Sequence, residues 1–412
     1  MGTETNGARS SGELARPLAP SEGVTARSAE NIVVIGAGLA AVSAIEALRD
    51  EGYAGRLTLV GKEPELPYER PQLSKDFLSG AKEFKLSHDE AWYAEKDVTV
   101  LTGTTATALD LDNGTVTLDN GEELPFGALL LATGADPKTP PIPGIENAVT
   151  LRTVEDARGL KDAIRPGTRV VTVGGGWIGL EVAASATALG GKAVVIEALA
   201  QPLLNVLGPE LAEHVAALHT RHGVEIHTGT AVEAIEPGLV RTSAGEIPAD
   251  VVLVAVGAAP ATSLAADAGL QVGDGVVVDE RLRTSDPRVF AAGDVALAKH
   301  TVLGPLRVEH WDNAIKQGRL AARTMLGKEG VYDWQPYFFT DQFEFSMEYV
   351  GRSAPEDEVL LRGDTEGDEF IAYWRRGATV TAGMNVGIWD VNDKLRELVG
   401  TDADPDQLTD MS

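Results

Sequence analysis

Apolar residues in this chain gather in short runs that alternate with turns and with alanine-rich stretches. The same order occurs twice: a short apolar run, a glycine-rich turn, an alanine-rich stretch and a second apolar run. This order predicts strand–helix–strand units over residues 31–63 and 168–198. No apolar run approaches the roughly 18 residues that a membrane span requires, so we expect no membrane segment.

The other apolar positions extend the pattern around these two units. Residues 98–118 and 223–249 predict small paired-strand regions, because turn residues such as Asn-Gly separate short alternating runs. The segment VVLVAVGAAP at 251–260 echoes LLLATGADP at 129–137, which indicates a pseudo-repeat with the second unit inserted inside the first. After the insertion, residues 288–296 predict a buried strand that ends at an aspartate.

The last part of the chain has a different composition. A helix is predicted over about 310–327, and from residue 329 Tyr, Phe and Trp cluster. Alternating strand patterns then lead to a final helix at 390–399. This order predicts a separate C-terminal α+β domain.

Composition narrows the classes of partner. The formal net charge of −27 argues against nucleic acid and anionic membrane surfaces. The chain has no cysteine, which excludes disulfides, thiolate metal sites and a catalytic thiol. Residues 1–30 hold arginines, but the interspersed glutamates argue against a transit peptide, so we expect a disordered tail on a cytoplasmic protein.

The first glycine-rich turn has the chemistry of a phosphate cradle. Gly36 would make the tight turn, Gly38 would let a pyrophosphate approach the backbone, and Ala41 is small enough for close helix–strand packing. The helix that follows would present free N–H groups to the phosphates. Glu63, at the end of the next apolar run, is the acid expected to bind the ribose hydroxyls.

The second turn repeats this arrangement with Gly174, Gly176 and Gly179. Glu197 follows the next apolar run and would accept from an adenosine 2′-hydroxyl, whereas it would repel a 2′-phosphate. The stretch ALAQPLLN after it offers no Arg or Lys, so NADH is expected rather than NADPH. A protein with two dinucleotide sites most often passes electrons between them.

Several segments together resemble one family, the NADH-dependent, FAD-containing ferredoxin reductases that serve haem monooxygenases and ring-hydroxylating dioxygenases. The resemblance covers about residues 31–400. The chain is similar also to the reductase core of apoptosis-inducing factor. The segments that carry it are VIGAGLAAVSAIEALR, LPYERPQLSKDFL, LLLATGADP, GGGWIGLEVA, FAAGDVA, VEHWDNAIKQGRLAARTMLG, PYFFTDQFEFSMEYVG and AGMNVGIWDVND.

The resemblance implies an α/β fold of two Rossmann-like dinucleotide-binding domains, with the NAD domain inserted in the FAD domain, plus a C-terminal α+β domain that covers the flavin. After the tail at 1–30, we expect the FAD-binding domain at 31–140 and 261–328, the NAD-binding domain at 141–260 and the C-terminal domain at 329–412.

The resemblance also assigns residues to FAD. It places Lys75 beside the flavin and Asp294 on the ribityl chain. Relatives often carry an acid at the position of Lys62, which leaves open whether Glu63 or its neighbour binds the adenosine ribose. The FAD-binding residues expected in addition to the first glycine-rich turn are Glu63, Arg70, Lys75, Ala132, Thr133, Gly134, Arg152, Gly293, Asp294 and Trp311, and His310 and Phe339 are expected to bind a cofactor.

For the nicotinamide cofactor the resemblance adds Trp177, Ile178, Glu181 and Gly257. Glu181 is placed near the nicotinamide and the flavin lysine, so Lys75 and Glu181 are the expected catalytic pair. Phe339 stands where relatives often carry Trp, near the nicotinamide side.

The expected reaction is hydride transfer from NADH to FAD. Without cysteine, electrons must leave the flavin for an external acceptor, which in the family is a small iron–sulfur ferredoxin. Two other readings stay open: an NADH oxidase, quinone reductase or monodehydroascorbate-type reductase, and a redox sensor similar to apoptosis-inducing factor. We expect a monomer or weak homodimer.

Two groups of residues are expected at the surface. The helix segment NAIKQGRLAARTM carries Lys316, Arg319 and Arg323 on one face, and we expect an acidic ferredoxin to dock there, with Arg375 and Arg376 extending the patch. Four histidines gather near another helix without carboxylates at matching spacing, so we expect a solvated helix face and no metal site; they are His214, His219, His222 and His227.

Overall fold

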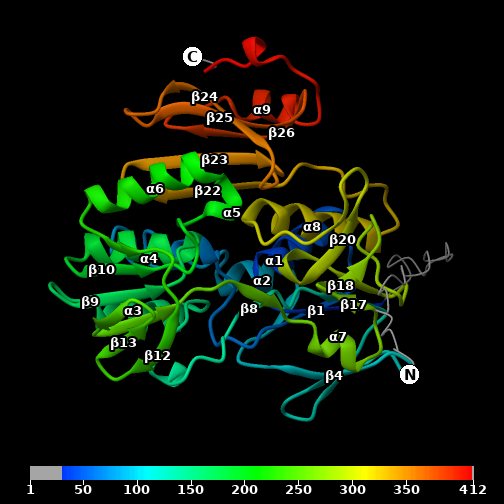
Figure 1. Ribbon diagram of the computed structural model, residues 1–412. Coiled ribbons are helices and arrows are strands. Elements are labelled where there is room, and N and C mark those ends of the chain that lie inside the picture. The colour runs from blue at the N-terminus through cyan, green and yellow to red at the C-terminus, as the bar shows by residue number, and fades with distance from the viewer. Residues whose placement is uncertain (1–29, 411–412) are drawn as a thin grey trace, which may run out of the picture.

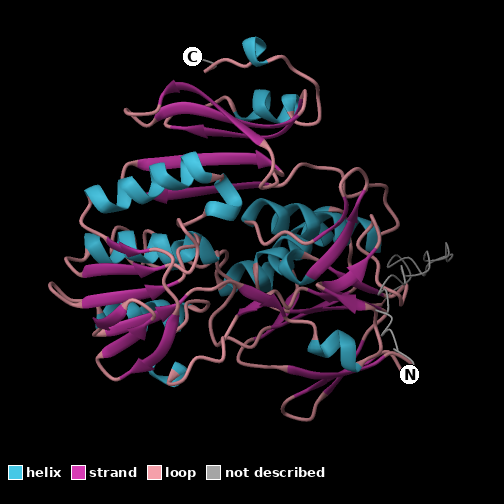
Figure 2. Cartoon of the chain, viewed as in Figure 1, coloured by secondary structure: helices cyan, strands magenta, loops and turns pink. Residues whose placement is uncertain are grey.

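The computed structural model describes residues 30–410 (Figure 1). The expected tail at 1–30 lies almost wholly outside the described residues. The described chain forms two parallel α/β layers side by side, with an antiparallel sheet stacked over one end (Figures 1 and 2). The α/β class with a C-terminal α+β part is confirmed; the domain boundaries remain a prediction.

The first layer is a five-stranded parallel sheet in the order β19-β7-β1-β2-β3. Its strands are short and apolar because both faces are buried against other elements of the first layer, as in other parallel sheets. The chain leaves this sheet after β7 and returns to it at β19. The strands are β1 (Asn31–Ile35), β2 (Arg56–Val60), β3 (Val98–Leu101), β7 (Ala128–Leu131) and β19 (Val289–Ala291).

Two helices pack closely in this layer. Helix α1 (Leu39–Asp50) follows the first glycine-rich turn, and α8 (Trp311–Met325) lies against it. Gly318 of α8 makes the approach possible, because a Cβ there would lie 2.3 Å from the carbonyl oxygen of Ala40. The start of α8 is thereby held next to the start of α1.

The second layer is a four-stranded parallel sheet in the order β11-β10-β9-β15. Helix α4 (Trp177–Ala188) follows the second glycine-rich turn and is buried on most sides, as its apolar sequence requires. The strands are β9 (Arg169–Val173), β10 (Lys192–Ile196), β11 (Glu225–His227) and β15 (Val251–Val254); the further helices are α3 (Val154–Ala163), α5 (Leu204–Leu207) and α6 (Pro209–Arg221).

The two echoing segments of the sequence lie side by side. Each continues past its parallel strand into a short one, β8 (Ala135–Pro137) and β16 (Ala258–Pro260), and these two pair antiparallel. The chain therefore crosses between the layers twice at one place, where it enters and leaves the insertion.

Two strand predictions were wrong at their first residues. Residues 225–227 do not pair within the second predicted hairpin region: they form β11, which adds to the edge of the second parallel sheet beside β10. Residues 98–101 do not pair within a hairpin: β3 adds to the edge of the parallel sheet beside β2. A short apolar run fits either place, and only the tertiary structure decides. The hairpin begins later. The small sheets are β4 (Ala106–Asp110), β5 (Thr115–Leu118) and β6 (Glu123–Pro125); β12 (Val232–Glu236), β13 (Leu239–Thr242) and β14 (Gly245–Pro248); and β17 (Val272–Gly273), β18 (Gly275–Val278), β20 (Ala296–His300) and β21 (Gly304–Leu306).

The C-terminal part is an antiparallel sheet in the order β22-β23-β26-β25-β24. It shares a core with the second layer, since Phe345 and Trp374 belong to the same apolar cluster as Leu211 and Val215 of α6. This packing brings β22 over the space between the layers (Figure 1). The elements are β22 (Tyr337–Gln342), β23 (Phe345–Gly351), β24 (Glu358–Asp364), β25 (Glu369–Arg376), β26 (Thr379–Val386) and α9 (Asn392–Leu398); α2 (Glu90–Glu95) and α7 (Ser263–Asp267) lie in the first layer.

Candidate functional site

A cavity of about 610 Å³ opens at the carboxyl ends of β1 and β7. Segments from all three parts of the chain line it: the first glycine-rich turn, the start of α4, the start of α8 and the start of β22. Ligands of open parallel sheets bind at this edge. The expected residues that line the cavity are Gly36, Gly38, Glu63, Arg70, Lys75, Ala132, Thr133, Gly134, Arg152, Trp177, Ile178, Glu181, Gly293, Asp294, His310, Trp311 and Phe339.

The first glycine-rich turn has the shape of a phosphate cradle. Gly36 has a φ of +100°, and a Cβ there would lie 2.1 Å from the carbonyl oxygen of Ala132, so only glycine fits. At Gly38 a Cβ would meet nothing within 4 Å, which leaves the N-terminus of α1 open toward the cavity. Ala41 is fully buried where helix and sheet pack. This open helix N-terminus fits a pyrophosphate.

The second turn has the same geometry and borders a separate hollow of about 480 Å³. Gly174 has a φ of +105°, Gly176 faces open space, and a Cβ at Gly179 would lie 2.1 Å from the oxygen of Gly174. Gly179 thus lines neither cavity; it lets helix and turn pack. Gly257 lines the hollow from the neighbouring strand end.

Glu197 also lines this second hollow, and its carboxylate is held in place by the backbone. Its Oε2 accepts from the N–H of Gly175 at 2.7 Å, and its Oε1 accepts from the N–H of Leu199 at 2.8 Å. Trp177 and Ile178, at the start of α4, line the larger cavity instead. Helix α4 therefore begins between the two spaces and separates them.

Glu63 is already engaged by two neighbours. Its Oε1 lies 2.7 Å from Arg70 Nη2, and its Oε2 accepts from the hydroxyl of Tyr68. Lys62, the alternative position, forms an exposed pair with Asp136 at 3.0 Å. Both positions line the cavity, so which of them binds a ribose stays a prediction.

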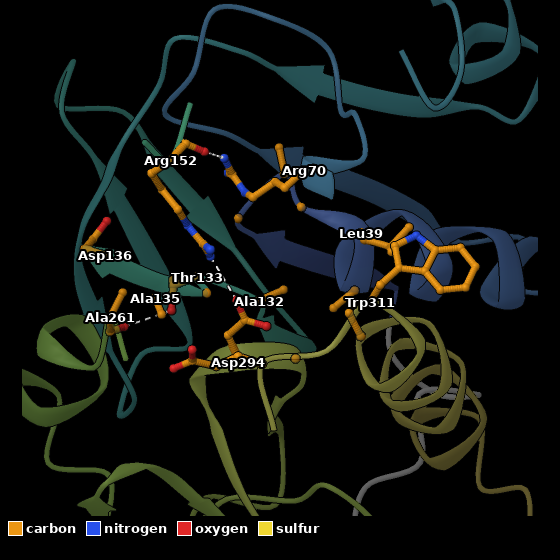
Figure 3. Close-up of a pocket in the computed structure, with 18 of the residues that line it drawn as sticks. Leu39, Arg70, Ala132, Thr133, Ala135, Asp136, Arg152, Ala261, Asp294 and Trp311 are labelled. Atoms are coloured by element: carbon orange, nitrogen blue, oxygen red, sulfur yellow. Dashed lines mark hydrogen bonds and ion pairs between the residues drawn. The ribbon is translucent and has the colours of Figure 1, made fainter. Parts of the chain in front are cut away.

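A line of charged groups runs across the cavity wall (Figure 3). Arg70 donates to the backbone oxygen of Arg152, and Arg152 Nη2 lies 2.9 Å from Asp294 Oδ2. Both side chains of the Arg152–Asp294 pair are at most 25% exposed. Because a largely buried charge is costly without a partner of opposite charge, each side chain stabilises the other. Thr133 donates to the oxygen of Ala261 at 2.9 Å and fastens the two crossing segments beneath them.

Lys75 and Glu181 form a buried ion pair that joins the two layers. Ser74 Oγ donates to Glu181 Oε2 at 2.5 Å, and Thr340 Oγ1 donates to Glu181 Oε1 at 2.6 Å. The pair was expected from the sequence, but Ser74 and Thr340 were missed. Each directly adjoins a residue in a recognised segment, Lys75 and Phe339, yet only the folded chain shows that both reach Glu181.

Aromatic side chains close one end of the cavity. Trp311 begins α8 and donates to Glu69 Oε2 at 2.8 Å, and its ring lies edge-on to Phe339 at 6.2 Å between centroids. His310 precedes it, and burial lowers the pKa of this histidine to about 4. A neutral imidazole therefore faces the cavity at physiological pH.

The expected docking surface carries less free charge than the sequence suggested. Lys316 pairs with Asp312 at 2.7 Å, Arg323 pairs with Glu51 at 2.6 Å, and Arg319 lies 3.9 Å from Glu46.

The expectation for Arg375 was wrong. Arg375 is buried, because a register shift at Trp374 turns its side chain inward to donate to the oxygen of Ala403. Arg376 is exposed but pairs with Asp357 at 2.8 Å.

The histidine cluster does not form one solvated face. His219 is fully buried against Gln342, and His214 and His222 pair with Asp368 and Glu344 of the C-terminal sheet. His227 pairs with Glu225. Within residues 30–410, no three His, Asp or Glu side chains gather as metal ligands would. No helix in that same range is long and apolar enough to cross a membrane.

Comparisons with known proteins agree with this geometry. Residues 30–318 match the pyridine nucleotide-disulphide oxidoreductase family, and residues 337–412 match the reductase C-terminal family. The chain is 38% identical to the benzene 1,2-dioxygenase system ferredoxin–NAD(+) reductase subunit of Pseudomonas putida, over 81% of this chain and 84% of that protein. It is 35% identical to the anthranilate 1,2-dioxygenase system ferredoxin–NAD(+) reductase component of Burkholderia cepacia, over 93% and 98%.

Among solved structures, the chain is similar to the reductase in the covalent putidaredoxin reductase–putidaredoxin complex. The TM-score is 0.86 with 32% identity, and the likeness covers 92% of this chain and 93% of that one.

Proposed function

The chain belongs to the pyridine nucleotide-disulphide oxidoreductase family, and from this premise we propose that it is a ferredoxin–NAD(+) reductase. It uses FAD and NADH and passes electrons to a small iron–sulfur ferredoxin. The observation that carries the proposal is the pair of glycine cradles, each with an open helix N-terminus, joined by the buried Lys75–Glu181 pair. The oxygenase served is a haem monooxygenase or a ring-hydroxylating dioxygenase.

FAD is assigned to the larger cavity. When bound there, FAD would supply the hydride-accepting and one-electron chemistry that transfer from NADH to a ferredoxin needs. Gly36, Gly38 and the N-terminus of α1 would hold its pyrophosphate, and the Arg152–Asp294 pair would give polar contacts to its middle part. Lys75 would supply a positive charge beside the ring system, balanced by Glu181. The neutral His310 adds no second cation there.

NADH is assigned to the second hollow. Gly174, Gly176 and the N-terminus of α4 hold its pyrophosphate, and the tethered carboxylate of Glu197 selects a free 2′-hydroxyl. Because α4 begins between the two spaces, a cofactor on its N-terminus can extend toward Trp177 and Glu181 at the wall of the larger cavity. The protein's part in the reaction is to hold donor and acceptor in contact.

The absence of cysteine supports an external acceptor. Members of this family that reduce disulfides need a cysteine pair, and the 412-residue sequence has none. Two relatives named above are ferredoxin–NAD(+) reductase components, and the structural relative was solved with its ferredoxin. We therefore propose that the acceptor of electrons from the flavin is a ferredoxin rather than a thiol or a quinone.

For the docking surface we propose the face of α8 that carries Lys316, Arg319 and Arg323. Its position next to Trp311, at the end of the cavity, supports this choice. Their acidic partners weaken the local attraction for an acidic ferredoxin. The expected effect of reversing the three charges is therefore a moderate loss of ferredoxin-dependent turnover that shrinks at high salt.

The proposed function is tested by the acceptor. NADH oxidation would be followed with cytochrome c as the terminal acceptor, with and without small [2Fe–2S] ferredoxins, putidaredoxin among them; ferricyanide reduction is the control for the flavin. We expect ferredoxin to accelerate cytochrome c reduction at least tenfold. Fast quinone or oxygen reduction with no response to any ferredoxin would favour the oxidase reading, and NADH-dependent dimerisation with slow turnover would favour the redox sensor.

A further inference from the structure

A buried chain of hydrogen bonds leads from α6 through β22 to the catalytic pair. His219 Nε2 lies 2.7 Å from Gln342 Oε1, Gln342 Nε2 donates to Thr340 Oγ1 at 3.2 Å, and Thr340 donates to Glu181. His219, Gln342 and Thr340 are each at most 1% exposed. Glu181 at the end of the chain is paired with Lys75. Side chains of the inserted layer and the C-terminal sheet thus meet at one carboxylate.

The direction of donation along this chain follows from the orientation of the Gln342 amide, whose oxygen faces His219 and whose nitrogen faces Thr340. An amide oxygen only accepts and an amide nitrogen only donates, so the ring hydrogen of His219 must be on Nε2. Thr340 accepts from Gln342 and has its single hydroxyl hydrogen left for Glu181. If the amide of Gln342 were turned over, its oxygen would face Thr340 and draw that hydrogen away from Glu181.

The state of His219 agrees with this direction. Burial lowers the pKa of His219, which keeps the ring neutral with one N–H. Its other nitrogen, Nδ1, is buried and has no hydrogen-bond partner within the described part of the chain. The one N–H, on Nε2, therefore donates to Gln342 Oε1, and the amide nitrogen of Gln342 donates to Thr340.

Both carboxylate oxygens of Glu181 accept hydrogen bonds in this arrangement. Ser74, Thr340 and Lys75 all donate to its two oxygens. Thr340 Oγ1 also lies 3.3 Å from Lys75 Nζ, so the hydroxyl touches both members of the ion pair. The position of Thr340 therefore decides how the negative charge of Glu181 is shared between the lysine and the hydroxyl.

We propose that Thr340 is a positioning residue for hydride transfer, oriented by Gln342 and His219. It rests on the proposed function, because it assumes that Lys75 and Glu181 lie where NADH meets FAD. Removing the hydroxyl returns more of the carboxylate charge to Lys75, which reduces the positive charge that the flavin experiences. Flavin reduction then slows, and the flavin midpoint potential becomes more negative.

The test compares Thr340→Val, which removes the hydroxyl at nearly constant volume, with Thr340→Ser, which restores it. Thr324→Val is the matched control, because Thr324 is 2% exposed and its hydroxyl has no partner within residues 30–410. In the FAD-loaded proteins we would measure the rate of flavin reduction by NADH in anaerobic stopped flow, the flavin midpoint potential and the thermal unfolding midpoint. Ferredoxin is absent from all three measurements.

We expect Thr340→Val to lower the limiting rate about tenfold, with the NADH concentration for half-maximal rate unchanged, and to move the midpoint potential to more negative values. Thr340→Ser and Thr324→Val should behave as the unmodified protein. Gln342→Met, which keeps Thr340 but removes its donor, should give an intermediate rate; it serves as the main variant if Thr340→Val does not fold.

Equal rates and potentials in Thr340→Val and the unmodified protein would overturn the inference. A defect in Thr340→Ser as large as that in Thr340→Val would also overturn it, because packing rather than the hydroxyl would then matter. A purified protein with no flavin spectrum would contradict the proposed function itself, and this is seen before any variant is compared.

Discussion

At the scale of single residues, the site depends on ion pairs between partly buried side chains. Arg152 and Asp294 show this clearly: neither has another carboxylate or guanidinium partner of comparable distance among the described residues. Asp294→Ala leaves Arg152 unpaired, and we expect FAD binding to weaken by about 1–3 kcal/mol.

The measurement is the dissociation constant of FAD from refilled apoprotein. The control is Asp162→Ala, which removes an exposed partner of Arg165 and should leave FAD affinity unchanged. Unaltered FAD affinity in Asp294→Ala would remove Asp294 from the cofactor site.

Glu197 is the residue expected to choose the nicotinamide cofactor. Two backbone N–H groups fix its carboxylate at the mouth of the second hollow, where a 2′-phosphate would meet a like charge. NADH should exceed NADPH by at least tenfold in kcat/KM, about 1.4 kcal/mol. Glu197→Arg should narrow or reverse the ratio, and Glu197→Gln should narrow it less. Equal use of both cofactors by the unmodified protein would show that this assignment is wrong.

At the scale of elements, close helix contact is what places the start of α8 at the cavity. Gly318→Ala would push a methyl group into the backbone of α1 at Ala40, and overpacking of this kind costs about 1–3 kcal/mol despite the better helix propensity of alanine. In α3, Gly159 is exposed and a Cβ there meets nothing within 4 Å, so Gly159→Ala should stabilise the protein by about 0.5–1 kcal/mol.

Thermal unfolding of both variants decides this prediction. A stabilised Gly318→Ala protein would mean that α1 and α8 are not packed as closely as the structure shows.

Some helices and strands could be predicted from the sequence and others could not. Each glycine-rich turn predicted the strand before it and the helix after it. The turn needs a residue with a positive φ and a position without a side chain, and only glycine provides both. Residues 98–101 were misplaced in a hairpin, since a four-residue apolar run fits a hairpin and a sheet edge equally well. Arg375 was misplaced on the surface because a register shift between the adjacent strands β25 and β26 turns it toward the backbone oxygen of Ala403, 28 residues further along the chain.

At the site, too, contacts between distant segments could not be predicted from the sequence. Lys75 and Glu181 belong to recognisable segments, but the residues that orient them do not. Thr340, Gln342 and His219 come together only when the C-terminal sheet packs on α6, so no local pattern marks them. The sequence pattern predicted that His219 lies on a solvated helix face, whereas its side chain is fully buried.

At the scale of the whole molecule, buried histidines should make stability depend on pH. His310 has a pKa of about 4 in the folded chain against 6.5 for a free histidine. Below pH 6.5 the unfolded state binds a proton that the folded state does not, so the free energy of unfolding falls as the pH drops from about 6.5 to 4. The loss from this group is at most about 3 kcal/mol.

His310→Gln should therefore lose less stability between pH 7 and pH 4.5 than the unmodified protein. Thermal unfolding midpoints across this range provide the comparison, and the carboxylates that titrate in both proteins cancel from it. His219, whose pKa burial also lowers, contributes in the same direction in both. Parallel pH profiles for the two proteins would show that His310 is not held neutral.

As a whole, the proposed molecule passes electrons from NADH through FAD to a ferredoxin. The most direct measurement is anaerobic double mixing: one equivalent of NADH is added to the FAD-loaded protein, and oxidised putidaredoxin is added once the flavin has bleached. We expect NADH to bleach the flavin and two equivalents of ferredoxin to restore its colour while becoming reduced. Bleaching that persists with excess ferredoxin, but is reversed by a quinone or by oxygen, would contradict it.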